Sequence, residues 1–165
     1  MIAEILNSYS LSLNFLRRLV ADVPDGSFAA QREGAVNHPA WVIGHLIHSA
    51  DAIGGEIGLS SWLPTDWGQQ FGTGSTPLPE REAYPSRESL LNMITDAEMR
   101  LTERLTEIGE RGLAQPLPDI RYREIFPTIG HAVLHILTAH AAVHIGQLTV
   151  WRRVMGFGPS GGPFV

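Results

Sequence analysis

A histidine-rich and largely apolar stretch, 128-TIGHAVLHILTAHAAVHIGQLTVWRRVM-155, lies near the C-terminal end of the sequence. It contains no proline, is rich in helix-forming apolar residues, and is followed directly by Gly156. Arg152 and Arg153 lie in its last turn, where cations favour a helix C-terminus. We therefore expect one long helix over Thr128–Met155.

Four of the seven histidines lie in this stretch, as the pairs His131/His135 and His140/His144. Within each pair the spacing is i,i+4, so both rings share one helical face. At about 100° per residue the two pairs lie about 180° apart. Only one pair can therefore face the core.

The apolar residues select the second pair. With His131 at 0°, the apolar side chains fall between about 120° and 260°. They are Ile129, Val133, Ile136, Leu137, Val143, Leu148, Trp151, Val154 and Met155. His140 and His144, at about 180° and 220°, lie inside this arc, with Gln147 at about 160°. Two imidazoles one turn apart on a buried face can hold one metal ion, and buried ring nitrogens need partners.

Composition indicates one globular domain over residues 1–165. The chain has 44% hydrophobic and 18% charged residues and no cysteine, which leaves histidine and carboxylate as metal ligands. A net charge of −5 argues against a nucleic-acid partner. The N-terminus has no secretory pattern, and histidines interrupt the longest apolar segment, which does not suit a membrane span. We expect a cytoplasmic protein without a membrane partner.

Three more amphipathic helices precede the histidine-rich stretch, over Ile2–Val23, Ala40–Leu59 and Arg87–Arg111. Asn37 or His38 is the expected N-cap of the second and Ser86 that of the third, which Gly112 stops. No strand pairing is credible, so the chain is predicted to be an all-α helical bundle. The tail, residues 156–165, is Gly/Pro-rich and need not form a regular element.

The connector over residues 60–85 has no helical or strand period and is long enough to span a helix. It contains Trp62, Trp67 and Phe71. These rings either cover the mouth of a pocket or plug the end of the bundle.

The second helix offers a third ligand. With Trp41 at 0°, its apolar side centres near 120°, His45 falls at about 40° and His48 at about 340°. His45 is therefore the better buried candidate, and Ser49 and Glu56 lie near its side as supporting partners or an extra ligand. His45, His140 and His144 would form a site for one ion, with an open position for water or substrate.

The alternative is that His140 and His144 are core histidines hydrogen-bonded to backbone, Gln147 or Glu56. His131 and His135, on the opposite side, are predicted to lie at the surface or in a helix-packing interface. Small residues share that side, namely Ala132, Ala139, Ala142 and Gly146. They would allow close approach of another helix and motivate a hypothesis of self-association.

Two segments resemble the signature regions of the DinB/YfiT-like superfamily: 37-NHPAWVIGHLIHSAD-51 and 137-LTAHAAVHIGQLTVWRRVMGFG-158. In that superfamily a GHL-type histidine and an HxxxHxGQ segment supply a histidine triad, which corresponds to His45, His140 and His144. The resemblance implies a divalent metal and a four-helix bundle, often dimeric. It also implies that the 60–85 connector is a long crossover between helices 2 and 3.

The resemblance implies several activities, because the superfamily includes S-transferases that use bacillithiol or mycothiol, a mycothiol-dependent maleylpyruvate isomerase and hydrolases. We expect an enzyme that uses zinc or nickel to transfer a low-molecular-weight thiol to a small electrophile. Without cysteine, the sulfur must come from outside. The alternatives are a metal-dependent hydrolase with Glu56 as base, and a non-catalytic bundle that binds a small ligand or a partner protein.

Overall fold

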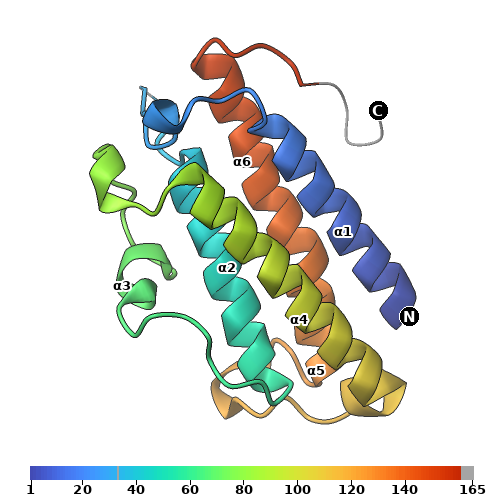
Figure 1. The fold of residues 1–165 in the computed structure, drawn as a ribbon. Helices are drawn as coiled ribbons and strands as arrows, with labels where there is room; N and C mark the ends of the chain where they lie inside the picture. Colours follow the sequence, from blue (N-terminus) through green and yellow to red (C-terminus); the bar gives the residue numbers. More distant parts are fainter. Residues whose placement is uncertain (33, 161–165) are drawn as a thin grey trace.

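The computed structural model describes residues 1–32 and 34–160, and its regular elements are helical (Figure 1). The elements are α1 (Ile2–Leu19), α2 (Pro39–Glu56), α3 (Trp67–Phe71), α4 (Arg87–Leu113), α5 (Ile129–Leu134), a π-helical turn (His135–His140) and α6 (Ala141–Val154). Short 3₁₀ turns occupy Asp25–Ser27, Arg81–Ala83 and Ile120–Tyr122. Within the described ranges no strand forms beyond isolated bridges, which confirms the all-α prediction. Residues 161–165 of the predicted irregular tail lie outside the described residues.

The long helices lie side by side and bury their apolar stripes between them (Figure 1). Side chains at three- and four-residue spacing meet in one cluster, because that spacing lines one helical face. The largest fully buried side chains include Leu13, Leu16, Ile43, Ile47, Leu90, Ile94, Leu101, Leu105 and Trp151. Each contributes on the order of 1.5–3 kcal/mol by leaving water. This core holds α2 against α6, where the histidines lie.

The helix α1 ends at Leu19, earlier than the predicted Val23. At this end the buried side chain of Arg152, on α6, donates to the Leu19 carbonyl at 2.9 Å and satisfies a backbone acceptor of the last turn. The same guanidinium pairs with Asp22 just beyond the helix, Nη2 to Oδ2 at 2.7 Å. A long-range cation therefore caps α1, and periodicity within α1 could not predict it.

The predicted N-caps are present. Ser86 Oγ accepts from the backbone of Ser89 at 3.1 Å, and of the two candidates before Pro39, His38 is the N-cap of α2. At the other end, α4 runs to Leu113 instead of stopping at Gly112, with a break at Gly109, whose φ is 61°. Glycine adopts this left-handed conformation without the steric cost of a Cβ.

The predicted helix over Thr128–Met155 is present as one helical stretch, Ile129–Val154, but it is not α-helical throughout, because a π-helical turn occupies His135–His140. Such a turn accommodates an extra residue and rotates the following helix by about 100°. Val143, predicted in the core, is therefore 60% exposed, whereas Ile145 is 4% exposed. The rotation also moves His140 and His144 from the centre of the buried face to its edge, where both are partly exposed.

The 60–85 connector was predicted to lack regular structure, but it contains the short helix α3, which packs along the flank of α2 (Figure 1). Trp67 and Phe71 are buried in this contact. They lie beside α2 and do not plug the end of the bundle, and neither is among the residues that line the cleft described below.

One described helical stretch, Ile129–Val154, is long and apolar enough to cross a membrane, with a mean hydropathy of 1.3. Core helices of soluble proteins share this length and composition, so the observation is weak evidence for a span. In the structure this stretch packs against α1, α2 and α4.

Candidate metal centre

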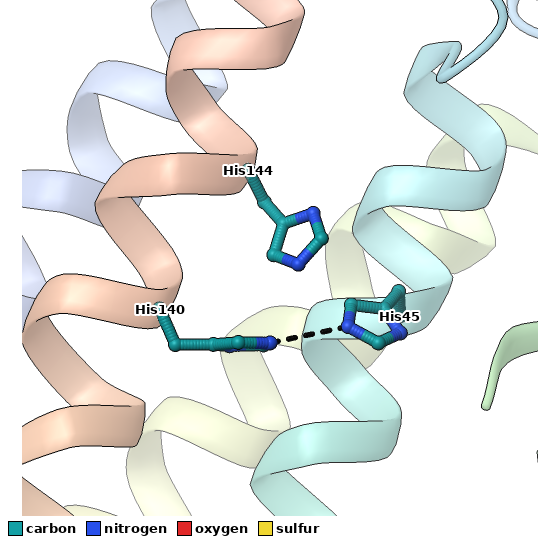
Figure 2. Close-up of side chains that lie close together, drawn as sticks. All are labelled: His45, His140 and His144. Atoms are coloured by element: carbon teal, nitrogen blue, oxygen red, sulfur yellow. Dashed lines mark hydrogen bonds between the residues drawn. The ribbon is translucent and has the colours of Figure 1, made fainter. Parts of the chain in front are cut away.

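The three predicted ligands meet between α2 and the last helix (Figure 2). His45 extends from α2, His140 ends the π-helical turn, and His144 follows one turn later on α6. One ring nitrogen from each lies within 4.8 Å of the others. The Nε2 atoms of His45 and His140 are 3.2 Å apart, and the ring centroids of His45 and His144 are 4.4 Å apart.

His45 is fixed on both sides of its ring. The side chain is 4% exposed and stacks on Trp41, with centroids 4.9 Å apart and planes inclined by 8°. Its Nδ1 lies 2.6 Å from the carbonyl oxygen of Phe71. A carbonyl can only accept, so the ring proton is on Nδ1 and Nε2 carries a lone pair directed at the other two rings.

Gly44 makes this hydrogen bond possible, because the ring of Phe71 occupies the space beside its Cα. A Cβ at Gly44 would lie 2.1 Å from Phe71 Cε1, far inside any contact distance. The same glycine accepts a hydrogen bond from Trp67 Nε1 through its carbonyl at 3.1 Å. The glycine of the GHL segment therefore lets α3 approach α2 closely and place the Phe71 carbonyl on His45.

His144 is oriented in the same way by a side chain. Its Nδ1 lies 3.0 Å from Gln147 Oε1, and Asn37 Nδ2 donates to the same oxygen at 3.0 Å. An amide oxygen that takes both bonds accepts from His144 Nδ1–H, which leaves Nε2 of His144 as a lone pair. Gln147 was named from the sequence as a partner of the histidines, whereas Asn37 and the Phe71 carbonyl were not.

His140 completes the cluster and differs from its neighbours. Its Nε2 points at His45, but its Nδ1 is buried without a hydrogen-bond partner among the described residues. Burial lowers the pKa of His140 and of His144 to about 4, and the neighbouring imidazoles add to the effect. Burial lowers the pKa of His45 as well. All three rings are therefore neutral near pH 7, the form that binds a metal ion.

The donor set fits a divalent cation. His45 and His144 each have a fixed tautomer, and the Nε2 lone pairs of both rings point towards the third ring, that of His140. Acceptors that point at one another need a shared proton or a cation between them. Three imidazoles suit zinc or nickel and leave at least one coordination position open. The outer hydrogen bonds to Phe71 and Gln147 are the kind that orient metal-binding histidines.

A cleft of about 480 Å³ reaches the triad at His140, within the range of small-molecule sites. Its walls are formed by the C-terminal half of α2, the π-helical turn and the segment after α4. The polar lining includes His48, Ser49, Glu56, Asp119, Arg121 and His135, and the apolar lining includes Ile53, Leu117, Tyr122, Phe126 and Ile136. A small substrate can therefore lie beside the triad.

Ser49 and Glu56, predicted to lie on the His45 side, have other partners. Ser49 Oγ donates to the backbone carbonyl of His45 at 2.9 Å, and Glu56 Oε2 accepts from the backbone of Asp119 at 3.0 Å. In the part of the chain that the structure describes, neither hydrogen-bonds to a triad ring. Glu56 instead fixes the segment after α4 and lines the cleft.

The positions of the histidines outside the triad agree only in part with the prediction. His131 is exposed as expected and hydrogen-bonds to Thr128 at 2.8 Å. His135 was expected on the same outer face, but it lines the cleft with its ring centroid 6.4 Å from that of His140. His135 is exposed, as predicted, but its assignment to the side opposite His140 was wrong, because the π-helical turn brings residues five apart to one side. His48 also lines the cleft.

The fold and the site together define an all-helical protein with three clustered histidines that could hold a metal ion. Residues 10–148 match the DinB superfamily, and the chain belongs to this superfamily. Among curated proteins and among solved structures, none matches the chain.

Proposed function

We propose that this protein is a divalent-metal-dependent enzyme in which His45, His140 and His144 hold zinc or nickel. The observation that carries the proposal is the pair of fixed tautomers. The Phe71 carbonyl and Gln147 Oε1 accept hydrogen bonds from Nδ1–H of His45 and His144, so both Nε2 lone pairs are directed into the same small space. Membership of the DinB superfamily supports the proposal.

The favoured reaction is transfer of an external low-molecular-weight thiol to a small electrophile. The ion supplies stabilisation of the thiolate, and this chain has no cysteine to provide the sulfur itself. The cleft of about 480 Å³ beside His140 supports this proposal, because it offers room for a small reactant next to the triad. The carbon–sulfur bond forms as the leaving group departs with its electron pair, and the thiol proton passes to solvent.

A second candidate is hydrolysis by metal-activated water. Its support is Glu56, a carboxylate in the wall of the same cleft that could act as base. Turnover of chlorodinitrobenzene that requires both added thiol and zinc or nickel would support the transferase. Ester or amide cleavage without thiol would support the hydrolase, and inactivity of a metal-free protein in both assays would leave a non-catalytic ligand-binding or interaction protein.

We also propose that residues 1–165 form one four-helix-bundle domain, with 60–85 as the crossover, that works as a cytoplasmic homodimer. Support for the dimer comes from a groove of about 290 Å³ between α1 and α6. Its lining carries no charge and consists of Ser8, Leu11, Ser12, Phe15, Ala142, Ile145 and Gly146. Val143 and Val150 on α6 are also exposed, at 60% and 54%. A second copy would remove this apolar surface from water.

A further inference from the structure

The three triad histidines are not equally supported. The outer nitrogen of His45 donates to Phe71 and that of His144 to Gln147, whereas the outer nitrogen of His140 is buried without a described partner. If Nε2 of His140 binds a cation, its Nδ1 must carry a proton. A buried donor without an acceptor costs about 1–3 kcal/mol, and metal-binding histidines almost always have such an acceptor.

The π-helical turn brings one candidate acceptor to the right side of the helix. In an α-helix, residues 135 and 140 would project about 140° apart, so His135 would point away from the cleft whenever His140 faced it. With the π-helical turn at His135–His140, both rings line the same cleft. Turns of this kind are rare and frequently mark functional sites.

The rings of His135 and His140 are near enough to reach hydrogen-bond distance after a small movement. Their centroids are 6.4 Å apart, against 5.2 Å for His45 and His140, whose ring nitrogens already lie at 3.2 Å. The difference is 1.2 Å, within reach of a side-chain rotation. The ring of His135 is exposed and lies against Phe126, with centroids 5.2 Å apart and planes inclined by 35°, and no hydrogen bond from the described residues holds it in this orientation.

We propose that His135 is a positioning residue for the metal centre. In the metal-loaded protein its ring accepts a hydrogen bond from His140 Nδ1–H. Each triad histidine then has an acceptor for its Nδ1–H: Phe71 for His45, Gln147 for His144 and His135 for His140. This inference rests on the proposed metal binding. It gives the π-helical turn a function, because without that turn His135 could not reach the site.

The test is zinc affinity, measured by competition with a chelator, in wild type and three variants. His135→Phe keeps a ring against Phe126 but removes the acceptor, and His135→Gln keeps an acceptor. His131→Phe makes the same change on the outer face. We expect His135→Phe to weaken zinc binding about 10- to 100-fold, with His131→Phe unchanged and His135→Gln close to wild type.

Nitrogen-15 NMR of the zinc-loaded histidines supplies a second readout. The proton on His140 Nδ1 should be protected from exchange with solvent in wild type and in His135→Gln. In His135→Phe this protection should be lost. Wild-type affinity in His135→Phe, or an equal loss in His135→Gln, would overturn the inference while leaving the metal centre intact. A wild-type protein that binds no zinc would overturn the metal centre and, with it, this role of His135.

Discussion

At the scale of single residues, the site depends on where protons lie. Gln147 Oε1 accepts from His144 and from Asn37, each at 3.0 Å, so one amide oxygen fixes a ligand tautomer and ties α6 to the segment before α2. The Phe71 carbonyl does the same for His45 at 2.6 Å. These two acceptors, an amide oxygen and a backbone carbonyl, are both uncharged, and they direct the lone pairs of His45 and His144 towards the same space.

Replacing Gln147 by alanine should therefore weaken metal binding without removing a ligand. We expect zinc affinity to fall about 10-fold or more, because His144 loses the acceptor that holds its tautomer. Gln69→Ala, at an exposed position on α3, is the matched control and should bind as wild type. Equal affinities in a chelator competition would contradict the orienting role of Gln147.

The residues that the sequence predicted and those it did not differ in a physical way. His45, His140 and His144 could be grouped because their spacing and the surrounding apolar residues fix the face they share. The acceptor from Phe71 is its backbone carbonyl, which every residue has, so the residue type could not predict it. His135 was misplaced because nothing in the local sequence announces a π-helical turn.

At the scale of elements, the contact between α2 and α3 positions His45. Gly44→Ala would place a Cβ 2.1 Å from the Phe71 ring. We expect a net destabilisation of about 1–2 kcal/mol, because overpacking outweighs the better helix propensity of alanine. Zinc affinity should fall as well, because α3 carries the Phe71 carbonyl away from His45.

Gly55→Ala is the control for this change. It lies in the same helix with nothing within 4 Å of the added Cβ. Helix propensity alone predicts a gain of about 0.5–1 kcal/mol there. Chemical denaturation of both variants measures the difference, and a Gly44→Ala protein as stable as Gly55→Ala would refute the close-packing argument.

The N-cap of α2 predicts a pH dependence of stability. His38 is fully buried, its Nδ1 accepts from the Trp41 backbone, and its Nε2–H donates to the Leu78 carbonyl at 2.9 Å. Burial lowers the pKa of His38 from 6.5 to about 4. Because the folded pKa is the lower one, this stability is complete above pH 6.5 and is lost as the pH falls from 6.5 towards 4.

The comparison that isolates His38 is wild type against His38→Asn, since asparagine also caps helices but does not titrate. Between pH 7 and pH 4.5, wild type should lose about 2 kcal/mol more of its unfolding free energy than the variant. Urea denaturation at both pH values measures this loss. Parallel pH profiles would show that the buried ring of His38 carries no such linkage.

The spacing of apolar residues predicted which helices form better than it predicted where they end. The existence and type of the long helices followed from their apolar spacing, and Ser86 was correct as an N-cap because capping is local. The predicted end of α1 was wrong, and a partner there is Arg152, which is distant in the sequence; the predicted facing of α6 was wrong because of the π-helical turn before it, which apolar spacing does not reveal. Long-range contacts of this kind cannot be read from a single segment.

At the scale of the whole molecule, the uncharged face of α1 and α6 predicts self-association. Leu11, at the groove between these helices, is 41% exposed. Leu11→Glu should convert a dimer to monomer, because the carboxylate would be buried without a partner. Met99→Glu, at a 53% exposed position on α4, should leave the dimer intact. Light scattering checks both, and a wild-type monomer at high concentration would refute the interface.

The metal content of untagged protein is the most direct test of the proposed metal centre. We predict about one equivalent of zinc or nickel in the wild type and in His131→Ala. A folded His140→Ala, His144→Ala double variant should contain almost none, because a single remaining imidazole cannot hold the ion. A wild type that neither contains metal nor takes up added zinc or nickel would contradict the proposed metal centre. The three histidines would then be core residues linked by hydrogen bonds.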